Sequence, residues 1–102
     1  MSDIENEIVS VAKKILEGAL GVIEGARILK SFRVHSAFEN DEDILVAVAI
    51  DSDSDSFPIG EMRKNWSPDA LCIKDKEMEL IQNYYRDYLF SACDRLLKRL
   101  QN

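Results

Sequence analysis

Apolar residues recur at helical spacing near the N-terminus of the chain. One apolar position follows another after three or four residues, as on one side of a helix: Ile4, Ile8, Val11, Ile15, Ala19 and Val22. Gly18, Gly21 and Gly25 interrupt this pattern, and a glycine in a helix interior costs about 1 kcal/mol relative to alanine. We therefore expect a first helix from Asp3, a break within residues 18–21, and a second helix that follows the break.

A longer amphipathic pattern runs from Ser67 to the end of the chain. Ser67 is a favourable N-cap, and Pro68 suits the first position of a helix. The apolar positions that follow lie on one broad face: Met78, Ile81, Tyr85, Tyr88, Ala92, Leu96 and Leu100, widened by Leu80, Tyr84, Leu89, Cys93 and Leu97. An unbroken helix would be roughly 50 Å long, more than a compact domain of this size spans. We expect a bend near residues 74–77, or an end that projects and needs a partner, and we interpret the tyrosines as core residues.

The run from Ile44 to Ile50 is compatible with two structures. Asn40 or Asp41 as an N-cap, followed by further acidic residues, favours a helix. The alternation of β-branched residues with leucine and alanine favours a strand. A strand needs a partner, and no other part of the chain offers a comparable run. We predict a short buried helix, and the alternative is a small hairpin within residues 44–62.

These elements predict an all-α fold, a single-domain bundle of about four helices with a long C-terminal helix, over residues 1–102. The alternative is an α+β fold that contains the hairpin. Hydrophobic residues at 46% and charged residues at 31% are ordinary values for a globular protein. No apolar run approaches the length of a bilayer span, and the N-terminus is acidic where a signal peptide is basic. We expect a cytoplasmic protein that does not bind membranes.

The net charge of −6 originates in one segment. Residues 1–38 carry five acids and five bases, and residues 57–102 carry seven acids and eight bases. Residues 39–56 carry seven acids and no base. Binding to phosphate groups needs a basic patch, so this distribution argues against nucleic acid as a partner. It favours a cationic partner, a bound cation or high solubility alone.

The chain contains no recognisable catalytic or metal-binding motif. Nucleophilic catalysis with a histidine base depends on His35, the single histidine. Cys72 and Cys93 are 21 residues apart and form no C-x-x-C pair. Residues 51–56 alternate aspartate and serine as a calcium loop begins, but the glycine and glutamate expected at positions six and twelve are absent. We predict that this polar run terminates the preceding helix, and that the protein has no cofactor and no enzymatic activity.

The segment before the last helix holds both prolines and the single tryptophan, in the pattern P-x-G-E-x-R-x-x-W-S-P from Pro58 to Pro68. Together with G-V-I-E-G-A-R at residues 21–27, it resembles a family of small bacterial helical proteins of about this length that has no assigned chemistry. Proteins of this sort include immunity proteins of contact-dependent growth inhibition systems. The resemblance covers most of the chain and implies an antidote to a delivered toxin, with no catalytic residues to carry over.

Two hypotheses of function follow. The first is an immunity protein that binds and neutralises a basic toxin, with a nuclease as the favoured class, by covering its cleft with an acidic surface. The residues assigned to this partner-binding surface are Asp41, Glu42, Asp43, Asp51, Asp53, Asp55 and Glu61. The alternative is a structural or regulatory protein that self-associates, as in a homodimer, through its C-terminal helix.

Overall fold

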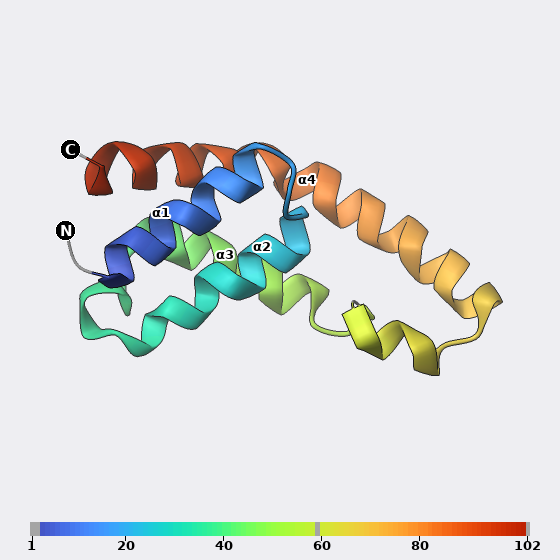
Figure 1. Ribbon diagram of the computed structural model, residues 1–102. Helices are drawn as coiled ribbons and strands as arrows, with labels where there is room; N and C mark the ends of the chain where they lie inside the picture. The colour runs from blue at the N-terminus through green and yellow to red at the C-terminus, as the bar shows by residue number, and fades with distance from the viewer. Residues whose placement is uncertain (1–2, 59, 102) are drawn as a thin grey trace.

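The computed structural model describes residues 3–58 and 60–101, and every regular element within them is helical (Figure 1). The α-helices are α1 (Asp3–Leu16), α2 (Val22–Lys30), α3 (Glu42–Ser54) and α4 (Pro68–Leu100). Three short 3-10 helices lie between them: η1 (Ser31–Val34), η2 (Ser36–Phe38) and η3 (Gly60–Asn65). The predicted all-α fold with a long C-terminal helix is confirmed.

Gly18 lies at the break between α1 and α2, and Gly25 lets the two helices pack closely. Gly18 has a φ of +83°, in the left-handed region that favours glycine, and it lies just after the end of α1. Gly25 lies inside α2, where a Cβ atom would come within 2.5 Å of Cγ1 of Ile15 on α1. The predicted break is therefore confirmed, and Gly25 allows α1 and α2 to approach each other.

Residues 44–50 form the centre of α3, so the helix prediction is confirmed and the hairpin alternative is wrong. Asp41 caps this helix, because its Oδ1 atom accepts hydrogen bonds from the backbone N–H groups of Asp43 at 2.9 Å and Ile44 at 3.3 Å. The polar run at 51–56 does end the helix, since α3 stops at Ser54 with Asp55 as its C-cap, although the first four residues of the run are helical. Packing of α3 in the core outweighs the β-branched residues' preference for strands.

The core forms where α1, α2, α3 and the second half of α4 meet (Figure 1). Its largest fully buried apolar side chains are Ile8, Ile15, Ile23, Leu29, Ile44, Ile50, Leu89 and Leu96. Burial of a side chain of this size contributes about 1.5–3 kcal/mol. All buried residues of α4 belong to its second half: Leu89, Ala92, Cys93 and Leu96.

Residues 68–88, the first 21 of the 33 residues of α4, are here called the α4 arm; the start of the arm projects beyond the bundle, whereas Met78, Ile81 and Tyr85 pack against the edge of the core (Figure 1). No residue of this range is buried. The whole helix has 33 residues without a break, and the molecule measures 47 × 24 × 22 Å along its principal axes. Of the two outcomes predicted for a helix this long, the projecting end is confirmed.

The segment with the P-x-G-E-x-R-x-x-W pattern connects α3 to the start of the α4 arm. Ser67 caps α4, because its Oγ atom accepts a hydrogen bond from the backbone N–H of Ala70 at 3.2 Å. On η3, Arg63 forms a two-pronged ion pair with Asp75 of the arm, at 2.8 and 2.9 Å. The hydrogen bond from Arg63 holds the pKa of Asp75 below its usual value. This segment therefore turns the chain and ties η3 to the arm.

Candidate protein-binding surfaces

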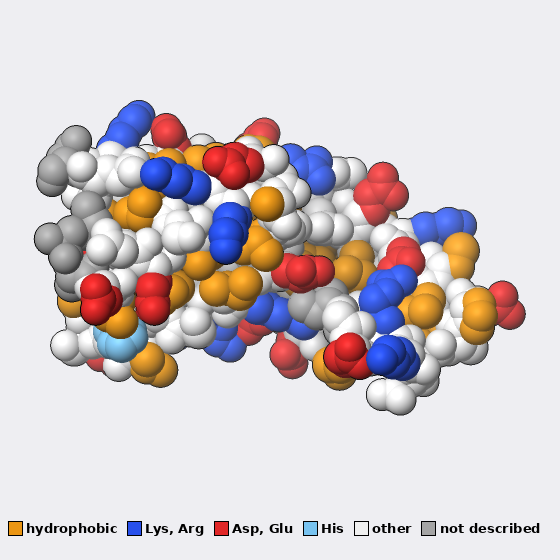
Figure 2. Space-filling view, in the orientation of Figure 1, with side chains coloured by type: hydrophobic (Ala, Val, Ile, Leu, Met, Phe, Trp, Pro, Cys, Tyr) orange, Lys and Arg blue, Asp and Glu red, His pale blue; other side chains and the backbone are white. Residues whose placement is uncertain are grey.

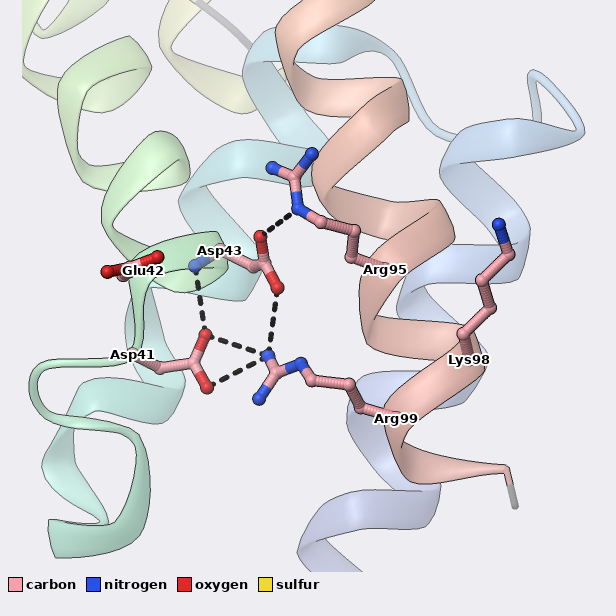
Figure 3. Close-up of a pocket in the computed structure, with 6 residues that line it drawn as sticks. All are labelled: Asp41, Glu42, Asp43, Arg95, Lys98 and Arg99. Carbon is pink, nitrogen blue, oxygen red and sulfur yellow. Dashed lines mark hydrogen bonds and ion pairs between the residues drawn. The ribbon is translucent and has the colours of Figure 1, made fainter.

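Three of the seven predicted partner-binding residues line a hollow of about 410 Å³ between the start of α3 and the end of α4 (Figure 3). α3 and α4 run antiparallel here, so acidic side chains at the N-terminus of one helix face basic side chains at the C-terminus of the other. Each set also interacts favourably with the dipole of its own helix. The lining residues are Asp41, Glu42, Asp43, Arg95, Lys98 and Arg99.

Two of these carboxylates are held by arginines. Nη2 of Arg99 donates to both carboxylate oxygens of Asp41, at 3.0 and 2.9 Å, and to Oδ2 of Asp43 at 2.9 Å. Nε of Arg95 donates to Oδ1 of Asp43 at 2.6 Å. Asp43 is only 6% exposed, and a carboxylate is buried to this degree only where it is paired. Glu42 points away from the arginines (Figure 3).

The carboxylates of this hollow keep Arg99 charged, and together with burial they keep the nearby Cys93 thiol neutral. Burial opposes the charge of Arg99, but the hydrogen bond to Asp41 and the charges of both carboxylates leave its pKa above the ordinary arginine value. On the same part of α4, burial and then the charge of Asp43 raise the pKa of the Cys93 thiol to about 12. A thiol with this pKa is protonated at neutral pH and is a poor nucleophile.

Asp51 forms a second buried cluster, with two bases of α2. Its Oδ1 atom lies 3.3 Å from Nε of Arg27, and its Oδ2 atom accepts a hydrogen bond from Nζ of Lys30 at 2.6 Å. Arg27 also donates to the backbone carbonyl of Ser54 at 2.6 Å. Asp51 is 8% exposed, so it joins α2 to the last turn of α3 and presents little surface to a partner.

The other predicted residues lie apart from these clusters. Asp53 accepts a hydrogen bond from the Tyr85 hydroxyl, and this bond, followed by burial, raises the pKa of Tyr85 to about 12. Glu61 is exposed on η3 and pairs with Lys64 at 2.8 Å. Glu42 and Asp55 are exposed near opposite ends of α3. Thirteen residues separate them, roughly 20 Å along a helix.

The structure therefore disperses the acidic surface expected from the sequence. Asp41, Asp43 and Asp51 pair with cations of α2 and α4, and Asp53 binds a tyrosine hydroxyl. The bases that neutralise the acidic segment come from distant parts of the chain, which a count of charge along the sequence does not reveal. The assignment of the seven residues to partner binding stays a prediction, and its exposed members include Glu42, Asp55 and Glu61.

The α4 arm carries an apolar surface that includes two of the tyrosines predicted to lie in the core. Four large side chains on it are mostly exposed: Ile73 (61%), Leu80 (71%), Tyr84 (65%) and Tyr88 (57%). They follow one another after seven, four and four residues, so they share one side of the helix and are here called the arm stripe. The interpretation as core residues fits Tyr85, which packs against the core, and is wrong for Tyr84 and Tyr88, because α3 reaches only the edge of this side of α4 and leaves both rings mostly exposed.

The tyrosine end of the arm stripe adjoins α3. Tyr84, Tyr85 and Tyr88 surround a hollow of about 210 Å³ together with Val46 and Ala49 of α3. The rings of Tyr84 and Tyr85 meet edge to face, with centroids 4.8 Å apart. On the face shown in Figure 2, hydrophobic side chains are also exposed at the end of the molecule formed by η3 and the start of α4. In the sequence, this surface was indicated by the additional apolar positions, such as Leu80 and Tyr84, that widen the apolar face of the last helix.

Comparison of the chain with protein-family models, with curated proteins and with solved structures found no match. Among the residues that the structure describes, no group of three or more His, Cys, Asp or Glu side chains is placed to hold a metal ion. Within the same residues, no helix is both long and apolar enough to cross a membrane.

Proposed function

We propose that this chain is a protein-binding domain and that the α4 arm carries its contact surface. The observation that carries this proposal is the arm stripe, in which four large apolar side chains lie 57–71% exposed on one side of a single helix. Large exposed apolar side chains gathered on one side of a helix favour an interaction site, and tyrosine is enriched in interface cores. Its ring offers contact area while its hydroxyl remains compatible with water.

The arm is held in place before any partner binds. The ion pair between Arg63 and Asp75 ties it to η3, and the hydrogen bond between Tyr85 and Asp53 ties it to α3. Lys74 also lies over the ring of Phe57, with its Nζ atom 5.6 Å from the ring centroid. A surface fixed in this way loses little conformational entropy on binding, which favours affinity.

The proposal is tested by affinity capture with the tagged full chain and mass spectrometry of the retained proteins. The arm variant combines Leu80→Gln with Tyr84→Gln, and the control is Glu79→Gln, an exposed change away from the arm stripe. All these side chains are exposed, so each substitution should change the free energy of unfolding by less than about 0.5 kcal/mol. We expect a protein, or the chain itself, to be retained by the wild type and the control and lost by the arm variant. Equal retention by all three would contradict the proposal.

A basic toxin is the second candidate partner, favoured by the net charge of −6 and by the exposed carboxylates of Glu42 and Asp55. In this proposal the chain is an immunity protein, as its resemblance implies, and neutralises a toxin such as a nuclease. Capture at low and moderate salt tests it with Glu42→Lys and Asp55→Lys, which leave the internal ion pairs intact. A basic protein held by the wild type and released by these variants is expected. If both variants retain the captured protein as well as the wild type does, this assignment is contradicted.

A further inference from the structure

We infer that the α4 arm binds the same arm of a second copy of this chain, with the two helices antiparallel about a two-fold axis near residues 81–82. The inference rests on the proposed function, because it names the partner of the same surface. Three features of the arm favour a second copy as its partner: the shape of the arm stripe, the charges beside it, and the area that it can bury.

The arm stripe is apolar at both ends, and Glu77, which pairs with Lys74 of its own helix, lies between Ile73 and Leu80. Ile73, Leu80, Tyr84 and Tyr88 span fifteen residues of one helix, roughly 22 Å. When two copies meet antiparallel, the tyrosine end of each stripe lies against the Ile73 end of the other, and each Leu80 lies beside a Tyr84. A two-fold interface is self-complementary, so every such contact occurs twice.

The charges beside the arm stripe select the antiparallel orientation. Lys76 and Asp87 are both exposed and eleven residues apart, which is about three helical turns, so they border the same side of the stripe. Within one chain they are roughly 16 Å apart and cannot pair. In the antiparallel dimer Lys76 of each copy faces Asp87 of the other, which forms two ion pairs. In a parallel dimer, the side of each stripe that carries Lys76 and Asp87 would face the opposite side of the other stripe, so neither ion pair would form.

The area of the arm stripe fits a specific dimer of moderate affinity. With exposures of 57–71%, the four side chains together expose roughly 450 Å² per copy, or roughly 900 Å² in a dimer. Specific interfaces bury about 1,000 Å² or more in total, and the flanking charged side chains supply the difference. We therefore expect a reversible dimer with a dissociation constant in the micromolar range.

Sedimentation equilibrium of the full chain at increasing concentration tests the inference. We expect the wild type and the Glu79→Gln control to dimerise, and Leu80→Gln to shift the equilibrium to the monomer. Lys76→Asp and Asp87→Lys should each weaken the dimer by roughly ten-fold, because each places two like-charged pairs across the interface. Circular dichroism of each variant verifies that the helical bundle is intact.

A charge swap tests the orientation. The double variant Lys76→Asp/Asp87→Lys should recover the affinity of the wild type. A mixture of the two single variants should also form a mixed dimer, because each then supplies the charge that the other lacks. A wild type that stays monomeric would overturn the inference, whereas arm-dependent capture of a different protein would leave the proposed function standing. Dimerisation that is insensitive to the single changes, or that is not recovered by the swap, would overturn the antiparallel pairing.

Discussion

Replacement of Asp43 by asparagine is expected to lower the free energy of unfolding by about 2 kcal/mol. Asp43 is 6% exposed and accepts hydrogen bonds from Arg95 at 2.6 Å and Arg99 at 2.9 Å. Loss of one partner from a buried ion pair costs about 3–5 kcal/mol when the other charge stays buried. Here the arginine side chains are 54% and 46% exposed, so they regain hydration and the cost falls toward that of one or two charged hydrogen bonds.

Thermal and urea unfolding, followed by circular dichroism, measure this change. For a chain of this size, 2 kcal/mol corresponds to roughly 10 °C in Tm. Glu42→Gln is the matched control, because it removes one negative charge from the same helical turn and therefore the same favourable interaction with the helix dipole. Glu42 is exposed and points away from the arginines, so its replacement should change stability by less than about 0.5 kcal/mol.

The comparison of the two variants can refute the reasoning. Equal losses for Asp43→Asn and Glu42→Gln would show that the ion pairs do not tether α3 to α4. A double-mutant cycle with Arg99→Gln measures the tether itself. A coupling energy indistinguishable from zero would mean that the two side chains contribute independently, contrary to the geometry.

Two further predictions concern the contacts of α2 and of the arm. Gly25→Ala should lower the free energy of unfolding by about 1 kcal/mol, because overpacking against Ile15 outweighs the gain in helix propensity. If urea unfolding shows that the variant is more stable than the wild type, the close contact between α1 and α2 is contradicted. The pKa of Tyr85 is raised to about 12 from an ordinary value near 10, so the folded state favours the protonated phenol. The stability that its hydrogen bond to Asp53 contributes is therefore complete below pH 10 and is lost as the pH rises toward 12. Spectrophotometric titration should show a late phenolate step that Tyr85→Phe removes, and survival of that step would refute the assignment.

The helices could be predicted from the sequence because their signals are local. Apolar spacing, the Asp41 and Ser67 N-caps and the glycines at 18–21 each act within a few residues, and the structure contains each feature. The ambiguity at Ile44–Ile50 was resolved by the absence of a partner strand. The end of α3 within the polar run was predicted, but the pairing of Asp51 with Arg27 and Lys30 of α2 was not, because it depends on residues distant in sequence.

The candidate sites depended on contacts between distant residues, and the sequence did not reveal these. The partners of Asp51 and Asp43 lie 21 and 52 residues away from them along the chain, so part of the negative charge of this segment is neutralised by distant bases. Periodicity also shows that a side of a helix is apolar without showing what covers it. Tyr84 and Tyr88 were therefore assigned to the core, although the length of the last helix had already indicated a projecting end.

Amide NMR spectra of the full chain, recorded at low and at high concentration, show whether two copies associate and whether they do so through the α4 arm. Association through the α4 arm predicts chemical-shift changes and line broadening confined to residues 73–88 and to the part of α3 beside the tyrosines, with α1 unchanged. Leu80→Gln should abolish these changes. Spectra that do not depend on concentration, or changes centred on Glu42 and Asp55, would contradict it.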